Sequence, residues 1–120
     1  MSDWQDHPIV PIGKPRMTQR DRWKQRPVVL RYHAFKDLCR EWNVELSDHF
    51  RVIFVIPMPK SWSKKKKAAH DGQPHRAKPD IDNVLKALMD AVLEDDSHVW
   101  SVRASKRWGY EGKIKILLYC

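Results

Sequence analysis

One continuous apolar run constrains the fold more than any other part of the chain. Residues 49–57 are rich in β-branched and aromatic side chains, and Pro57-Met58-Pro59 ends the run. Apolar and polar residues alternate only at its start, so its second half is apolar on both faces. A strand of that kind fits the interior of a sheet better than an edge. We therefore predict a central strand at residues 49–57.

Two amphipathic segments are predicted to be helices that pack on this sheet. The first runs from residue 28 to about residue 42, where apolar residues recur at helical spacing. These residues are Leu30, Ala34, Leu38 and Trp42. The second helix runs from residue 83 to residue 93, with an apolar side made of Val84, Leu85, Leu88 and Val92.

The remaining regular structure is predicted at the two ends of the chain. Residues 8–12 form an apolar run broken by prolines, which permits only an edge strand or an extended arm. Residues 99–103 and 113–119 are predicted strands, joined through residues 108–112 with their turn-forming glycines. A chain of 120 residues holds one core of ordinary size. We expect a single mixed α/β (α+β) domain spanning residues 1–120, with a small mixed sheet and two main helices.

Basic residues exceed acidic ones and gather in two segments without a steady apolar period. The chain has 23 Lys and Arg against 15 Asp and Glu, a formal charge of +8, which favours a polyanionic partner such as nucleic acid. The two segments are predicted loops at residues 13–27 and 60–78, of which residues 62–69 could form a short helix. The expected DNA contacts are Lys14, Arg16, Lys64, Lys65, Lys66, Lys67, Arg76 and Lys78.

Three tryptophans stand beside these and other basic residues. Trp23, Trp62 and Trp108 offer flat surfaces on which an unpaired base could stack. Tryptophans are nevertheless more often core residues, and a lysine run is more often a solvated face. The collective basic surface is therefore the firmer prediction.

Residues 79–86 form the only stretch in which several carboxylates, a lysine and a change of secondary structure coincide. Asp80 and Asp82 can share one ligand only while the backbone is extended, because residues two apart diverge on a helix. We expect the helix to begin at about Asp82 or Asn83. Lys86 then lies one turn beyond Asp82 on the same face.

Clustered carboxylates without His or Cys beside them suit a hard cation such as Mg²⁺ or Mn²⁺. A third carboxylate would come from Asp95 or Asp96, returned to the site by the turn between helix and strand. The alternative is that the pair at 80 and 82 only caps the helix, that the second pair is an ordinary acidic turn, and that Lys86 is a surface lysine. Spacing alone leaves both interpretations open.

Cysteine usage and hydropathy bear on the compartment. Cys39 and Cys120 are far apart and form no CxxC pair, so we expect free thiols rather than a disulfide framework or a zinc site. No apolar run approaches the roughly 20 residues that span a bilayer, and no signal-peptide pattern stands at residues 1–6. These features predict a soluble cytoplasmic protein without a membrane partner.

The motif D-x-D-N-x-x-K-x-x-x-D-A at residues 80–91, with the acidic pair at 95–96 before a strand, closely resembles the RusA family of Holliday junction resolvases from phages and prophages. The resemblance implies a homodimer that binds four-way DNA junctions in recombination and repair. It also implies two symmetric incisions that require Mg²⁺, for which Mn²⁺ may substitute, in the cytoplasm of a host bacterium or phage-infected cell. The implied metal ligands are Asp80, Asp82 and Asp96, and the implied catalytic residues are Lys86 and Asp82.

The resulting hypothesis is a metal-dependent crossover junction endodeoxyribonuclease that hydrolyses phosphodiesters with a metal-activated water. One alternative is a non-catalytic protein that binds branched or single-stranded DNA. Another is a general nuclease without junction preference. Dependence of cleavage on Mg²⁺ separates the first alternative, and a comparison of junction with linear duplex separates the second.

Overall fold

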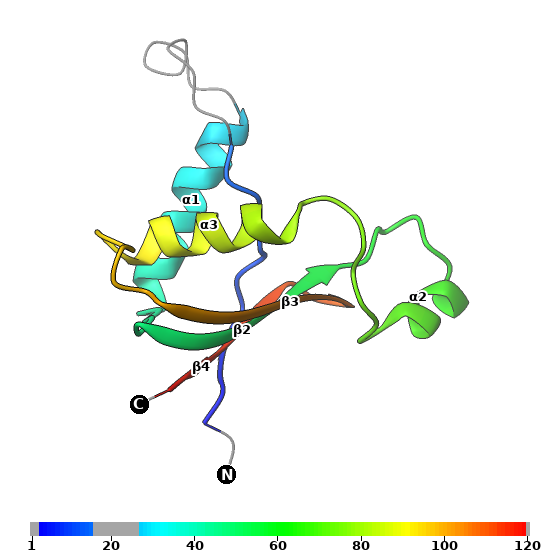
Figure 1. Ribbon diagram of the computed structural model, residues 1–120. Helices are drawn as coiled ribbons and strands as arrows, with labels where there is room; N and C mark the ends of the chain where they lie inside the picture. Colours follow the sequence, from blue (N-terminus) through cyan, green and yellow to red (C-terminus); the bar gives the residue numbers. More distant parts are fainter. Residues whose placement is uncertain (1–2, 16–26, 120) are drawn as a thin grey trace.

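The computed structural model describes residues 3–15 and 27–119 of the chain (Figure 1). Its elements, in order, are β1 (Gln5–His7), α1 (Pro27–Glu41), β2 (His49–Pro57), α2 (Lys64–His70), α3 (Ile81–Val92), β3 (Ser101–Gly109) and β4 (Lys113–Leu118). They form one compact domain of mixed α/β class, as predicted. The predicted residues Arg16, Trp23 and Cys120 lie outside the described part. No helix within that part is long and apolar enough to cross a membrane.

The apolar run is an interior strand, as its composition predicts. The sheet order is β1-β4-β2-β3, in which β2 pairs parallel with β3 and antiparallel with β4. Side chains alternate along β2, so that Phe50, Val52 and Phe54 are fully buried while Ile53 and Val55 on the other face are half-buried. The central strand is thus apolar on both faces but covered fully on only one.

The two C-terminal strands are joined by a turn, yet they are not neighbours in the sheet. β2 lies between them, because the turn after Gly109 carries the chain across the end of β2 to its other side. β3 is also longer than predicted and begins two residues later. Its parallel pairing with β2 runs from His49 opposite Ser101 to Pro57 opposite Gly109, which supplies hydrogen-bond partners along all nine residues.

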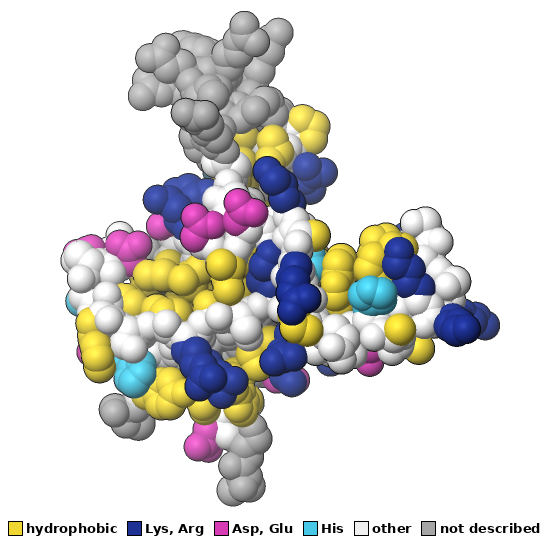
Figure 2. Space-filling view, turned by 45° about the vertical axis from the view of Figure 1, so that its right-hand side comes forward, with side chains coloured by type: hydrophobic (Ala, Val, Ile, Leu, Met, Phe, Trp, Pro, Cys, Tyr) yellow, Lys and Arg dark blue, Asp and Glu magenta, His cyan; other side chains and the backbone are white. Residues whose placement is uncertain are grey.

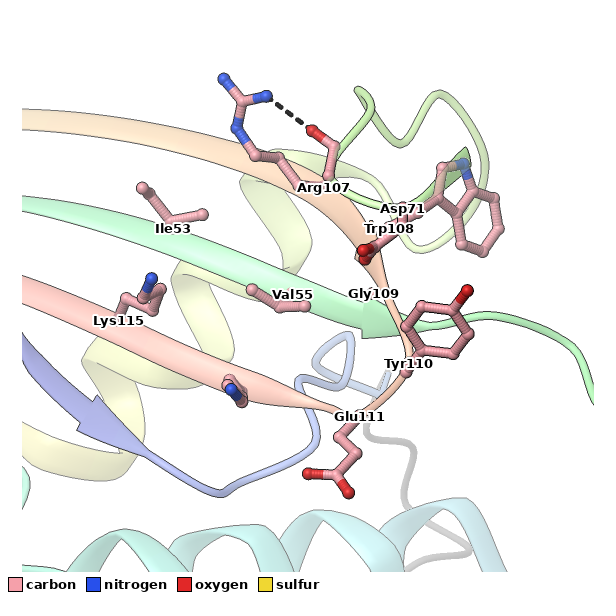
Figure 3. A pocket seen from close by; sticks show the side chains of 11 residues that line it. Ile53, Val55, Asp71, Arg107, Trp108, Gly109, Tyr110, Glu111 and Lys115 are labelled. Carbon is pink, nitrogen blue, oxygen red and sulfur yellow. Dashed lines mark hydrogen bonds between the residues drawn. The ribbon is translucent and has the colours of Figure 1, made fainter. Parts of the chain in front are cut away.

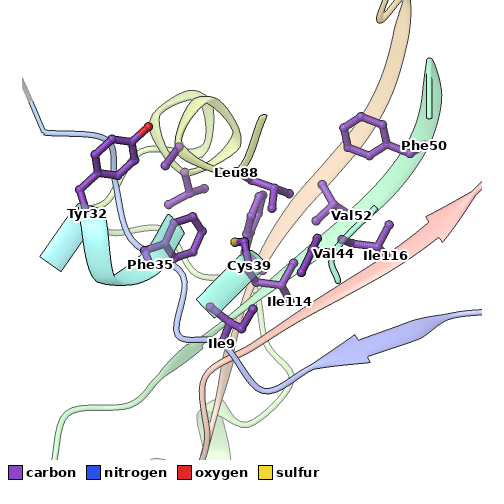
Figure 4. Packing of buried hydrophobic residues seen from close by; sticks show 13 residues of the cluster. Ile9, Tyr32, Phe35, Cys39, Val44, Phe50, Val52, Leu88, Ile114 and Ile116 are labelled. Carbon is purple, nitrogen blue, oxygen red and sulfur yellow. The ribbon is translucent and has the colours of Figure 1, made fainter. Parts of the chain in front are cut away.

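Helices α1 and α3 lie on the same side of the sheet (Figure 1) and bury a shared core (Figure 4). The bounds of α1 match the prediction, but the predicted apolar face was wrong. Leu30, Leu38 and Trp42 remain 52%, 38% and 48% exposed, and Ala34 is exposed as well. The buried face consists of Val29, Tyr32, Phe35 and Cys39. Both rows have helical spacing, so spacing alone does not decide which of them packs against the sheet.

The N-terminal arm, which is not part of the sheet at residues 8–12, contributes a side chain to the core. The edge strand β1 precedes the proline-broken run, which itself forms the extended arm that was the alternative prediction. Ile9 on this arm is fully buried and belongs to the same core cluster as Cys39 of α1. Cys39 is a free thiol, as expected, and burial raises its pKa to about 11. It is therefore almost wholly protonated at neutral pH and unreactive.

Candidate functional site

The first acidic pair lies at the N-terminus of α3. Asp80 is the N-cap residue, with extended backbone at φ −67° and ψ 151°, but its carboxylate makes no capping hydrogen bond. The helix begins at Ile81, slightly earlier than predicted, because the carbonyl of Asp80 already accepts hydrogen bonds from the backbone N–H groups of Asn83 and Val84 at 3.1 Å. Asp82 therefore lies in the first helical turn, while Asp80 keeps the extended backbone just before it, so the two carboxylates do not both occupy helical positions. Both carboxylates are exposed.

The loop that delivers Asp80 is fastened along the edge strand β3. Backbone hydrogen bonds join Gly72 N to Trp108 O and Trp108 N to Gln73 O, each at 2.9 Å, and His75 N to Lys106 O at 3.0 Å. An isolated antiparallel bridge pairs Pro74 with Arg107 within this series. The loop thus behaves as a short additional strand, and its position relative to β3 is set by several bonds rather than by one.

Lys106 extends this attachment to the residue before Asp80. Its Nζ donates hydrogen bonds to the carbonyl oxygens of Ala77 and Pro79, both at 2.7 Å, on either side of the cis Lys78-Pro79 peptide. A cation that bonds two carbonyls is a strong clamp, because hydrogen bonds to charged groups are worth more than neutral ones. Nothing near Lys106 in the sequence predicts this contact, since the partners are 27 and 29 residues away.

The N-terminal arm supports the same corner from the other side. Gly13 leaves no spare room, because a Cβ there would lie 3.0 Å from the Asn83 amide nitrogen and 3.1 Å from the Pro79 Cβ. The backbone N–H of Lys14 donates to the Asn83 carbonyl, and the Lys14 ammonium forms an ion pair with Asp90. The hydrogen bond from the Lys14 ammonium to the Asp90 carboxylate raises the pKa of Lys14. Lys14, predicted as a DNA contact, is thus engaged by a carboxylate of α3.

Lys86 is exposed one helical turn beyond Asp82. The ion pairs within the described residues join Lys14 to Asp90 and Arg40 to Asp37, and neither involves Lys86. Lys86 is therefore a surface lysine, and the described residues show no ion pair between it and a carboxylate of α3. Its ammonium is available to a ligand bound near Asp82.

The second acidic pair lies beyond the opposite end of α3. A helix of 12 residues is about 18 Å long at 1.5 Å per residue, and Asp80 precedes its first residue whereas Asp96 follows its last. Residues 93–100 lead directly from the helix into β3 and do not run back along it. Across residues 3–15 and 27–119, no three His, Cys, Asp or Glu side chains come together to hold a metal. The structure brings Asp80 and Asp82 to one end of the helix without Asp96.

Asp95 is used by the local chain. Its Oδ1 accepts a hydrogen bond from the Ser97 backbone N–H at 2.9 Å, and this bond lowers the pKa of Asp95. The Asp96 carbonyl accepts from Val99 N at 3.1 Å in the same turn. At this end of α3, the acidic-turn interpretation describes what the chain does.

The basic segment before the motif contains a short helix, α2, which projects beyond the end of the sheet (Figure 1). Ser63 caps it, its Oγ accepting from Lys66 N at 3.1 Å. The four consecutive lysines 64–67 therefore lie on helix α2 rather than in a loop, and Arg76 and Lys78 follow it as exposed residues. Figure 2 shows Lys and Arg side chains on this projecting part and on the neighbouring surface.

An aromatic cluster joins α2 to β3. The Trp62 ring lies 4.8 Å from both the Trp108 and His70 rings, and His75 lies 4.3 Å from Trp108. His75 is 4% exposed, and burial lowers its pKa, with the Lys106 cation lowering it further. Beside the cluster is a hollow of about 610 Å³ that contacts both indoles and the loop leading to Asp80. The sequence indicated the two tryptophans but not that they meet.

A second hollow, of about 450 Å³, lies on the open face of the sheet (Figure 3). Ile53 and Val55 form its floor, and Arg107, Lys113 and Lys115 bring cations to it, none of which was predicted to bind DNA. Asp71 and Glu111 also line it. Neither carboxylate of the motif reaches this hollow, so it is separate from the predicted chemistry.

The comparison with protein families covers both the acidic motif and nearly the whole fold. The model of the endodeoxyribonuclease RusA family matches residues 8–119. The chain belongs to the RusA family. The match covers both acidic pairs and every helix and strand of the chain from α1 to β4.

One curated relative shares part of this RusA-family chain. The uncharacterized protein YqaN of Bacillus subtilis (strain 168) is 38% identical over 71 residues, which is 52% of this chain and 49% of that protein. The alignment therefore spans about half the length of the relative. No solved structure matches the chain.

Proposed function

We propose that this RusA-family chain is a metal-dependent endodeoxyribonuclease that cuts four-way DNA junctions. The observation that carries the proposal is the corner at the start of α3, where Asp80 and Asp82 are exposed, Asp80 does not cap, and Lys86 stands one turn away. Family membership supplies the class of reaction. The net charge of +8 supplies the attraction to DNA.

The donor set at this corner fits a hard divalent cation. Asp80 and Asp82 would hold it, because Mg²⁺ in phosphate-processing sites is usually bound by one or two carboxylates together with substrate phosphate and water. No nitrogen or sulfur ligand is needed for such a site. When bound, the ion would neutralise charge on the phosphate and lower the pKa of a coordinated water. Asp96, at the far end of α3, leaves the remaining positions to the substrate and water.

The other residues of the corner act on the substrate or on the loop. Lys86 places a positive charge beside the phosphate held at Asp82, where it stabilises the negative charge that grows during hydrolysis. Lys106 holds the backbone before Asp80 in place, so the Asp80 carboxylate is already positioned when DNA binds. Lysines 64–67, Arg76 and Lys78 contact the DNA backbone near the cut.

A junction has two-fold symmetry, and paired incisions need two such corners. We propose that two copies of the chain supply them, because symmetric oligomers match symmetric substrates. This part of the proposal predicts a dimer on the DNA with both corners facing strands of like polarity.

The test compares a labelled four-way junction with a linear duplex of the same sequence. With Mg²⁺ or Mn²⁺ we expect paired cuts in the junction, and with Ca²⁺ we expect binding without turnover, because Ca²⁺ is larger and less exacting in geometry. Full cleavage in excess EDTA would contradict the metal-dependent mechanism. Equal cleavage of duplex and junction would favour the general nuclease, and binding without cleavage under every metal would favour the non-catalytic alternative.

A further inference from the structure

We propose that the hollow between α2 and β3 holds an unpaired DNA base and so gives the protein its preference for branched DNA. The inference rests on the proposed function, because the base belongs to the strand whose phosphate lies at Asp80 and Asp82. The hollow is lined by Trp62, Lys66, His70, Gln73, Arg76 and Trp108, among others.

The aromatic residues do more than anchor α2. No residue of α2 is buried, and neither tryptophan belongs to the main core cluster. Trp62 and Trp108 are each half-buried, their rings are tilted by 53° to one another, and the space beside them is open. The two rings thus present an accessible surface beside this space instead of filling it. A volume of about 610 Å³ lies within the range of small-ligand pockets.

The polar residues of the hollow match a nucleotide. Lys66 Nζ lies 4.3 Å from the centroid of the Trp62 ring, and Arg76 and Gln73 are exposed at the lining. Aromatic rings stack on bases, cations neutralise the adjoining phosphates, and an amide pairs with a base edge. The described residues that line this hollow include no carboxylate, whereas Asp71 and Glu111 line the hollow on the open face of the sheet. Charge therefore favours the hollow beside α2 as the place for DNA.

The hollow and the Asp80 carboxylate lie close to each other along the same loop. Ala77 lines the hollow, and Asp80 follows three residues later, which is at most about 11 Å of extended chain. Lys106 bonds this segment to β3 two residues before Trp108. A base in the hollow and a phosphate at Asp80 are thus neighbours on the same strand.

This arrangement explains selection by structure rather than by sequence. A base inside a duplex is stacked and paired, and extracting it costs a few kcal/mol, whereas a base at the branch point of an opened junction is already unpaired or easily freed. Only a branched or single-stranded substrate fills the hollow without that cost. A strand whose base occupies the hollow then has a neighbouring phosphate at the carboxylates.

The experiment measures binding alone, in metal-free buffer, with Asp82→Asn protein as the background, so that it does not depend on cleavage. In that background Trp62→Ala is expected to weaken junction and single-strand binding about tenfold or more, with little change for linear duplex. Trp62→Phe keeps a flat ring and should retain most of the affinity. Trp100→Ala is the matched control, because Trp100 is 71% exposed, contacts the His49 ring and does not line the hollow.

A second measurement keeps the chain intact in case Trp62→Ala disturbs α2. Junctions carrying 5-iodouracil at successive positions are irradiated with the Asp82→Asn protein, and the attached peptide is identified by mass spectrometry. We expect attachment at Trp62 or Trp108 from a base next to the branch point. Attachment only elsewhere, or equal loss of duplex and junction affinity in Trp62→Ala, would overturn the base-binding role while leaving the proposed nuclease activity standing. Cleavage by Asp82→Asn in Mg²⁺ would instead remove the proposed function.

Discussion

The two ends of α3 each carry a pair of carboxylates, and the fold uses them differently. At the first end, Asp80 follows a loop held to β3 by Lys106, and its carboxylate has no local hydrogen bond to make. At the other end, Asp95 bonds the Ser97 N–H in a turn built from its own neighbours. A carboxylate positioned by distant residues and unused by local structure is available to a ligand, whereas one that closes its own turn is already satisfied.

The largest effect is expected from Asp82→Asn at the first end. If Asp82 is a metal ligand, cleavage of a junction should fall more than about 100-fold, since even residues that only orient a ligand are worth about 10- to 100-fold. Binding in metal-free buffer should stay equal or tighten, because one negative charge near the phosphates is lost. Initial cleavage rates and a gel-shift titration measure the two quantities.

The matched control is Asp37→Asn, an exposed carboxylate on α1 in a 3.7 Å ion pair with Arg40. It should cleave normally. Near-normal cleavage by folded Asp82→Asn would mean that Asp82 serves only the start of the helix, where Asn substitutes well for Asp.

The next prediction tests whether Lys106, which is distant in sequence, positions the loop before Asp80. Lys106→Met keeps the length of the side chain and removes both bonds to the loop, so cleavage should fall roughly 10- to 100-fold, as small displacements of reacting groups do. Junction affinity should change much less. Lys115→Met, at a half-buried lysine on the open face of the sheet, should retain activity. Equal activity of the two variants would show that the loop keeps its place without the clamp.

A comparison of basic side chains on α2 and on α1 tests which of these two surfaces lies against DNA. Replacing Lys64, Lys65, Lys66 and Lys67 by Ala should weaken junction and duplex binding alike, and should make the slope of log K against log salt shallower by about one unit or less per lost contact. The helix itself should survive, because alanine is the best helix former. A Lys36→Ala, Arg40→Ala double variant on α1 is the control. An unchanged slope for the lysine variant would identify the run as a solvated face.

A smaller effect is expected at the second end of the helix. Asp96→Asn should lower junction cleavage less than tenfold, because Asp96 follows the end of α3 opposite to Asp82 and the described residues bring no third carboxylate to that pair. The same rate assay, run beside Asp82→Asn, gives the comparison directly. A loss as large as that of Asp82→Asn would show that Asp96 reaches the carboxylate corner when DNA binds or comes from a second copy of the chain.

The smallest effect is on stability against pH. Burial lowers the pKa of His75 near the first end, so its contribution to stability is present above about pH 6.5 and is lost as the pH falls through the lowered value. The lowered pKa of Asp95 at the other end gives a contribution that is present above about pH 4 and is lost only as the pH falls further. Melting temperatures between pH 7.5 and 5 should fall less for His75→Gln than for the parent. His33→Gln, on the exposed side of α1, should follow the parent curve.

Some features of the site were readable along the chain and others were not. The interior position of β2, the two long helices and the coincidence of Asp80, Asp82 and Lys86 follow from patterns within a few residues. The partners of these residues do not. Lys106 contacts the loop across 27 to 29 residues, and Lys14 meets Asp90 across 76. Contacts of that separation leave no periodic signal in a single sequence.

Local conformations follow from patterns along the chain, because β-branched runs, helical spacing and prolines act through neighbouring residues. Packing in three dimensions selected which of the two equally spaced rows of α1 is buried, since that depends on the surface that the helix packs against. It also decided that β2 separates β3 from β4, and that Asp96 lies apart from Asp80. The physical reason is that a strand accepts partners on both edges and a rigid helix keeps its two ends about 18 Å apart. Residue patterns within a short stretch of sequence carry no information about these tertiary features.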